Sequence, residues 1–204
     1  ASGATPVAGG TDLVVGVRQG RSALPEDLVA IHRLTAMAGL CPGEDGGLHI
    51  GAGTTHREIC ADPAVQTRYT ALADASAIVG SPATRAAGTR GGNVANASPA
   101  ADTVAPLLCL GAIATVRSAG GERHIPVDGL TIGPRRTTLR PDELILGFEL
   151  PEPAAATGSA YVRLEYRRQM EIAVVGAAAV VTLGEDGRVV AARIAITALA
   201  PGMD

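Results

Sequence analysis

The stretch "AGTRGGNVANASPAADTVAPL", residues 87–107, holds two adjacent glycines, two asparagines, two prolines and an aspartate before an apolar run. The stretch "AGGTD", residues 8–12, pairs its glycines in the same way. Paired glycines permit positive φ and close backbone approach, and consecutive N–H groups can form a concave anion site beside a helix N-terminus. Together the two stretches predict a diphosphate site, with side-chain hydrogen bonds from Thr11, Thr89 and Asn93. Two ordinary glycine turns are the alternative.

Composition excludes several classes of function. All 17 basic residues are arginine, so neither a P-loop lysine nor a Schiff base is available. A net charge of −3 and 2% aromatic residues argue against nucleic-acid binding. Three widely spaced cysteines and four scattered histidines predict no metal site, and no residue forms a recognisable catalytic group. The absence of a signal or a long apolar run predicts a cytoplasmic chain without a membrane span.

Hydrophobic periodicity and turn residues predict alternating helices and strands. Thr55 and Glu58 form a capping box at the start of one helix, and either Thr11 or Asp12 is expected to cap another. The predicted helices cover residues 11–20 and 103–111, and a helix that Thr55 opens within residues 54–63 is expected to continue over 71–80, as far as the Ser-Pro at 81–82. The predicted strands cover residues 5–8, 26–34, 47–53, 112–118, 142–151 and 160–167, followed by two strands within 176–199 that a Gly-Glu-Asp-Gly turn joins. This order predicts an α+β fold.

The segment "PEPAAATGS", residues 151–159, has the composition of a linker. We therefore expect a first domain over 1–152 and the start of a second over 160–204. Since about 45 residues are too few for an independent core, the second part is expected to pack on the first domain, on a continuation or on a partner.

Four segments, in this order, resemble a known family: "PVAGGTDL", "GSPATRAAGTRGGNVANASPAADTVAPLLCLGA", "LRPDELILGFELP" and "YRRQMEIAVVGAAAVV". They are similar to the flavin-binding medium subunit of the molybdenum hydroxylases, which include xanthine dehydrogenase and aerobic carbon monoxide dehydrogenase. The resemblance covers essentially the whole chain. It implies an FAD-binding fold of the vanillyl-alcohol-oxidase kind, with two subdomains over about 1–44 and 45–152, followed by a C-terminal α+β domain.

The resemblance also implies which residues bind FAD. Those of the two glycine motifs would hold the diphosphate: Val7, Ala8, Gly9, Gly10, Thr11, Asp12 and Leu13 in the first, and Thr89, Gly91, Gly92 and Asn93 in the second. Further contacts fall by position on Val79, Asn96, Asp102, Ile145 and Arg163. For two of these the sequence alone leaves alternatives, because Asp102 could instead cap the helix that begins near Thr103, and Arg163, with Arg167 and Arg168, could line a solvated face.

The function implied by the resemblance is electron transfer. Partner chains would be a large subunit with a molybdenum cofactor and a small subunit with 2Fe–2S clusters, and FAD would pass electrons to NAD, a quinone or oxygen. Arg167, Arg168 and Glu171 are hypothesised to tune the flavin. Two other hypotheses remain: a stand-alone FAD-dependent reductase or oxidase, and a non-enzymatic nucleotide-binding module.

The chain departs from the family pattern at three places. Arg90 stands where isoleucine or valine is usual, and it would reach either a phosphate or solvent. The opening strand before "PVAGGTD" is largely absent, and the C-terminal domain stops after "ITALAPGMD". We therefore expect either a fragment or a naturally shortened member.

Overall fold

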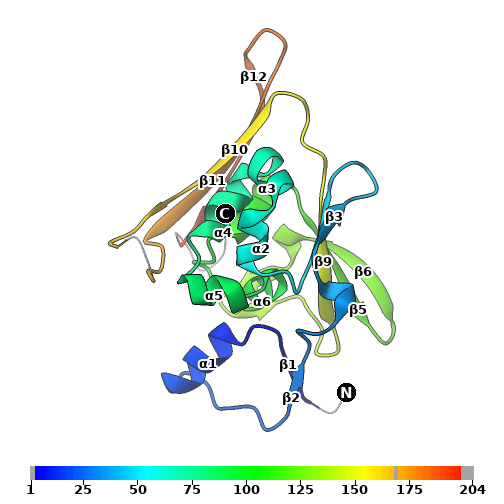
Figure 1. The fold of residues 1–204 in the computed structure, drawn as a ribbon, viewed down its shortest axis with the longest axis vertical. Coiled ribbons are helices and arrows are strands. Elements are labelled where there is room, and N and C mark those ends of the chain that lie inside the picture. Colours follow the sequence, from blue (N-terminus) through cyan, green and yellow to red (C-terminus); the bar gives the residue numbers. More distant parts are fainter. Residues whose placement is uncertain (1–2, 168–169, 199–204) are drawn as a thin grey trace.

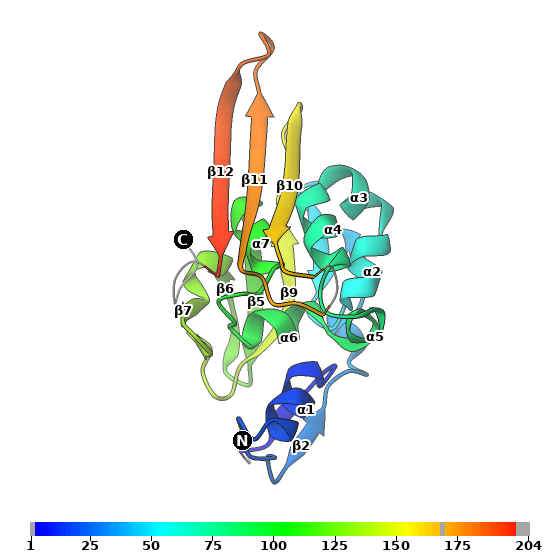
Figure 2. The same ribbon diagram turned by 90° about the vertical axis from the view of Figure 1, so that its left-hand side faces the viewer.

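The computed structural model describes residues 3–167 and 170–198 and shows a mixed α and β architecture. Figures 1 and 2 show a small N-terminal unit below a larger body in which helices lie between two sheets. Among the described residues, no helix combines the length and the apolar character needed to cross a membrane.

The N-terminal unit is a β-α-β segment. Its strands β1 (Thr5–Val7) and β2 (Leu28–Ala30) are parallel, and helix α1 (Thr11–Arg18) connects them. Two valines of α1 and a leucine and a valine of β2 remain about half exposed, because this unit is too small to cover them with its own side chains. Gly10, rather than Thr11 or Asp12, precedes the helix as its N-cap, and no side chain caps it.

The larger body is built on a five-stranded antiparallel sheet in the order β3-β4-β9-β5-β6. Its strands are β3 (Leu40–Pro42), β4 (Leu48–Gly51), β5 (Ile113–Ser118), β6 (Gly121–Pro126) and β9 (Leu144–Leu150). A short hairpin of β7 (Thr131–Gly133) and β8 (Arg136–Thr137) lies between β6 and β9 in the chain. The strands β3, β6, β7 and β8 were not predicted from the sequence.

Six helices follow β4 in the chain before β5. They are α2 (His56–Ala61), α3 (Pro63–Arg68), α4 (Thr70–Ala77), α5 (Pro82–Ala87), α6 (Arg90–Ala95) and α7 (Val104–Cys109). The 3₁₀ turns η1 (Thr35–Met37) and η2 (Val127–Gly129) complete the list. The predicted capping box at Thr55 and Glu58 is present at α2. Asp62 caps α3, where Pro63 occupies the first helical position and so favours a new helix.

A three-stranded antiparallel sheet covers the other side of the helices (Figure 2). It consists of β10 (Thr157–Leu164), β11 (Val175–Leu183) and β12 (Val189–Thr197), with the predicted hairpin between the last two. The sheet packs on helices α4 and α7 through small residues, such as Ala178 of β11 on the sheet and Ala71 and Ala75 of α4 on the helices. The sheet thereby brings β10 beside the stretch 87–107, which the candidate site uses.

Candidate functional site

The first glycine motif forms the turn between β1 and α1. Gly10 has φ 67°, a left-handed conformation that favours glycine, and its carbonyl accepts the N–H of Val14 at 2.9 Å. Within the described residues, the N–H groups of Ala8 through Leu13 donate to no protein acceptor. The first turn of the eight-residue helix α1 adds partial positive charge at the same place. This bend therefore presents a run of unused donors.

The second glycine motif is bonded differently. The N–H of Arg90 donates to the carbonyl of Thr54 at 2.9 Å, and that of Gly91 donates to Ala52 at 2.7 Å. Thr89 caps α6 by accepting the N–H of Gly92 at 3.2 Å, and its carbonyl accepts the N–H of Asn93 at 3.0 Å. Four successive amides of this motif are thus already satisfied by the protein.

Gly91 allows the close packing that these bonds require. A Cβ at Gly91 would lie 2.6 Å from the Cβ of Ala52, too close for real atoms, so α6 can dock on the end of β4 only without a side chain there. Gly92, by contrast, is exposed, and a Cβ there would meet only the Thr89 hydroxyl, at 3.0 Å. The two adjacent glycines of the motif consequently have different surroundings.

The two motifs lie against each other although about 80 residues separate them in the chain. A Cβ at Gly9 would lie 1.8 Å from the carbonyl oxygen of Ala87, and one at Gly88 would lie 3.5 Å from the hydroxyl of Thr11. Only glycine permits the first of these approaches. The turn that carries the unused amides therefore lies against the backbone of Ala87 and Gly88, immediately before the second motif, and this is a suitable place for a phosphate group.

The side chain of Arg90 points inward rather than to solvent. It is fully buried, donates to the carbonyl of Thr103 at 3.3 Å and to the Oδ1 of Asn93 at 3.1 Å, and also donates to the Thr103 hydroxyl. Its Cζ lies 6.0 Å from the ring centroid of Phe148. No carboxylate within the described residues pairs with it, its Nε lacks a partner, and burial lowers the pKa of Arg90 to about 9.

His56 is a second buried polar group at the same place, and the sequence analysis did not single it out. It begins α2, its N–H donates to the carbonyl of Gly88 at 3.1 Å, and its buried Nδ1 has no partner among the described residues. Burial, together with the positive charges of Arg90 and Arg85, lowers the pKa of His56 to about 3. The histidine is therefore neutral near neutral pH, and only its position after the capping residue Thr55 could have suggested it.

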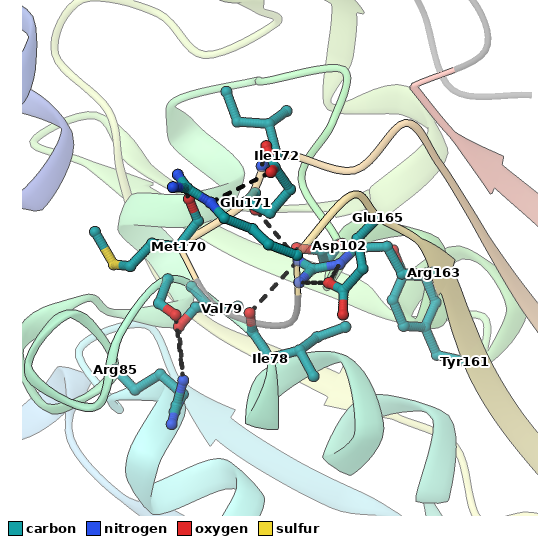
Figure 3. Close-up of polar contacts among 12 residues, drawn as sticks. Ile78, Val79, Arg85, Asp102, Tyr161, Arg163, Glu165, Met170, Glu171 and Ile172 are labelled. Carbon is teal, nitrogen blue, oxygen red and sulfur yellow. Dashed lines mark hydrogen bonds and ion pairs between the residues drawn. The ribbon is translucent and has the colours of Figure 1, made fainter.

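A buried ionic cluster lies at the other end of the stretch 87–107 (Figure 3). Asp102 accepts the hydroxyl of Tyr161 at 2.6 Å and pairs with Arg163 at 2.9 Å, and Arg163 also pairs with Glu165 through its Nε at 2.8 Å. Burial raises the pKa of Asp102, and burial beside that carboxylate raises the pKa of Tyr161. Of the alternatives that the sequence left open, the structure shows neither, because no side chain caps α7 and the side chain of Arg163 is buried.

Tyr161 was not predicted, although a signal existed. It stands two positions before Arg163 on β10, so both side chains lie on the same face of the strand. Arg85 was not predicted either. Its guanidinium donates to the carbonyl of Val79 at 3.1 Å and so fixes the backbone of Val79, a predicted FAD contact (Figure 3).

The remaining predicted residues are placed as follows. Val79 and Asn96 are half-buried, and Asn96 ends α6. Ile145 lies on β9 within the main hydrophobic core. Arg167 is largely exposed and lies 3.3 Å from Glu171, whereas Arg168 lies outside the described residues. In residues 3–167 and 170–198, no group of three His, Cys, Asp or Glu side chains is arranged to hold a metal ion.

The unused amides of the first motif, beside a helix N-terminus and a backbone contact that only glycine permits, fit a phosphate-bearing cofactor. The chain belongs to the family described as FAD binding domain in molybdopterin dehydrogenase, whose model matches residues 1–153. FAD is accordingly its cofactor, as the resemblance implied. The observations on the first motif supply the physical fit, since its donors suit an anionic diphosphate.

Relatives and solved structures support this family. The chain is 33% identical over 196 residues to a putative xanthine dehydrogenase FAD-binding subunit of Escherichia coli (strain K12), which covers 96% of this chain and 66% of the relative. It is 33% identical over 202 residues to the carbon monoxide dehydrogenase medium chain of Hydrogenophaga pseudoflava, with coverages of 98% and 68%.

A solved structure of carbon monoxide dehydrogenase from Hydrogenophaga pseudoflava, which lacks the Mo-pyranopterin moiety of the molybdenum cofactor, aligns with a TM-score of 0.93 at 31% identity. The alignment covers 100% of this chain and 70% of that one. Quinoline 2-oxidoreductase from Pseudomonas putida 86 aligns with a TM-score of 0.89 at 28% identity, covering 98% and 68%. The family prediction is confirmed.

Proposed function

We propose that this chain is the flavin-bearing electron-transfer subunit of a molybdenum hydroxylase complex. The observation that carries the proposal is the run of unused amides from Ala8 to Leu13 against the backbone of the second motif. When bound, FAD supplies a flavin that accepts electrons from iron–sulfur clusters and releases them singly or in pairs to NAD, a quinone or oxygen. The protein contributes binding, orientation and electrostatics.

The first motif is proposed to bind the diphosphate through its backbone. Amides from Gly9 to Leu13, with the N-terminus of α1, donate to phosphate oxygens, and the hydroxyl of Thr11 lies beside them. The second motif contributes shape through Gly91 and Gly92 and side-chain hydrogen bonding through Asn93 and Thr89. Val7, Ala8, Gly10 and Asp12 complete the proposed set.

The other proposed contacts are Val79, Asn96, Asp102, Ile145 and Arg163. Asp102 and Arg163 stabilise each other as a buried pair, so their contribution to the cofactor is a fixed polar surface rather than a free charge. Ile145 contributes from the core, where it helps to position β9. Arg167 and Glu171, with Arg168, are proposed to influence the flavin and the access of its acceptor.

The proposed architecture is a vanillyl-alcohol-oxidase-type fold. Its subdomains cover about 1–44 and 45–152, and a C-terminal α+β domain begins within 160–204. The separate β-α-β unit and the five-stranded sheet support the first division, and the sheet β10-β11-β12 supports the second. The proposed partners are a large subunit with a molybdenum cofactor and a small subunit with 2Fe–2S clusters.

The test is the visible spectrum of the native complex together with its subunit masses on a denaturing gel. We expect three kinds of polypeptide and a spectrum that contains both flavin and iron–sulfur bands. A single flavin-containing polypeptide that oxidises a reductant unaided would instead support a stand-alone reductase or oxidase. A colourless protein that does not bind added FAD would refute the proposal.

A further inference from the structure

Three side chains of the stretch 87–107, those of Arg90, Asn93 and Thr103, form a closed hydrogen-bonded set. Arg90 donates to the Thr103 hydroxyl and to the Oδ1 of Asn93, and the Thr103 hydroxyl donates to the same Oδ1 at 2.6 Å. Because the arginine can only donate, the Thr103 oxygen accepts from it and its proton points to Asn93. The directions of all three hydrogen bonds are therefore fixed by chemistry.

This set determines which end of the Asn93 amide is free. Two donors converge on one end of the carboxamide, so that end must be the oxygen, and turning the amide over would oppose an NH₂ group to two donors. Its Nδ2 donates to no protein acceptor among the described residues, and Asn93 is only half-buried. The NH₂ group is left as a pair of donors at the exposed side of α6.

The arrangement is costly for the fold alone. Arg90 carries its charge in a fully buried position, with an unsatisfied Nε and no carboxylate within the described residues. Burying a charge without a counter-ion is unfavourable, and an apolar side chain of similar volume is commonly more stable at such a position. Phe148 and the surrounding core offer such a side chain an apolar environment. Stability of the protein therefore does not explain the arginine.

We propose that Arg90 is a positioning residue for the flavin nucleotide, which holds the Asn93 carboxamide so that its NH₂ group faces an acceptor on the cofactor. The inference rests on the proposed FAD site of the second motif. Arg90 acts through Asn93 and Thr103 and does not itself touch the cofactor. Thr103 serves as the relay, since its hydroxyl accepts from Arg90 and donates to Asn93.

The experiment is a double-mutant cycle on FAD affinity. FAD is titrated, with flavin fluorescence as the signal, into the flavin-depleted protein and into Arg90→Met, Asn93→Ala and the double variant. Each single change is expected to raise the Kd of FAD at least about tenfold, because one oriented hydrogen bond is lost. The double variant is expected to resemble Asn93→Ala, since two residues that act through one contact are not additive.

The melting temperature of the flavin-free proteins separates positioning from a purely structural role. Arg90→Met is expected to melt at or above the temperature of the unmodified protein, because an uncompensated buried charge is removed. Arg57→Met, which removes an exposed charge on neighbouring α2, is the control and should leave the Kd unchanged.

Three outcomes would overturn the inference. They are an unchanged Kd in Arg90→Met, single-variant losses that simply add in the double variant, and a loss of FAD binding matched by a lower melting temperature. If the unmodified protein itself fails to bind FAD, the proposed function fails first, which is a distinguishable result.

Discussion

The two glycine motifs share a sequence pattern but differ in their hydrogen bonding. In the first, glycine leaves backbone N–H groups available to a ligand. Gly10 adopts a left-handed conformation, and the N–H groups of the next three residues have no hydrogen-bond acceptor within the described residues. In the second, glycine allows packing, since Gly91 lies against Ala52 and its amide is bonded there. A glycine pair can thus supply donors to a ligand or let protein backbones meet, and only the surrounding carbonyls decide between the two roles.

The largest expected effect is on the packing role of the second motif. Gly91→Ala would place a Cβ 2.6 Å from that of Ala52 and should destabilise the fold by about 2 to 3 kcal/mol. Gly92→Val, at an exposed position, should fold with nearly unchanged stability but lose FAD, since its branched side chain would stand where the cofactor must approach. Denaturant unfolding and flavin occupancy measure the two effects. Full flavin occupancy in Gly92→Val would contradict this division of roles.

The next effect is on the contact between the motifs. Gly9→Ala would place its Cβ 1.8 Å from the carbonyl oxygen of Ala87, so the two motifs must separate. We expect the Kd of FAD to rise about a hundredfold, which corresponds to about 2.7 kcal/mol, while the larger body unfolds as before. Gly158→Ala, at an exposed position of β10 with no positive φ and no atom near its Cβ, is the control. Equal FAD affinity in the two variants would show that the contact is not needed.

A smaller effect concerns pH and the buried environment of the second motif. The pKa of His56 is about 3 in the folded protein and 6.5 in its ordinary state, so the unfolded chain takes up a proton first as the pH falls. Stability should therefore decrease below pH 6.5, by about 1 to 2 kcal/mol near pH 5, and the decrease should end near pH 3. Comparing denaturant unfolding of the protein and of His56→Leu isolates this contribution. The same pH dependence in both proteins would exclude His56 as its source.

The smallest effect is expected at Gly10. Alanine is less favourable than glycine at φ 67°, so Gly10→Ala should lower stability by about 1 kcal/mol. Because the amides of the turn depend on this conformation, FAD binding should weaken more than stability does. A thermal melt with and without FAD compares the two. A variant that retains full affinity would imply that the turn tolerates another conformation.

Much of the fold follows from local patterns in the sequence. Thr55 and Glu58 predicted a helix start correctly, and the turn after Leu183 predicted the hairpin of β11 and β12. The strands β3 and β6 were missed because β3 is short and neither alternates clearly, so the sheet rather than its own sequence specifies each strand. The helix expected to open at Thr55 and to continue over 71–80 is divided into α2, α3 and α4, although the Asp62–Pro63 pair was a readable signal for a new helix.

The site was predictable in its residue types but not in its bonding. The glycine motifs could be found in the sequence, and their contact with each other follows the expectation of one shared site. The satisfied amides of Arg90 and Gly91 depend on Thr54 and Ala52, which follow a strand that is distant in the sequence. The burial of Arg90 depends in the same way on Phe148 and Thr103. Such long-range partners leave no local signal.

The most direct test of the two roles is residue-resolved amide hydrogen exchange with and without FAD. The amides from Gly9 to Leu13 should exchange rapidly in the flavin-free protein and become protected when FAD binds. Those from Gly91 to Asn93 should be protected in both states, since the protein already bonds them. Protection that appears on the second motif alone, with the first still exchanging rapidly, would contradict the account.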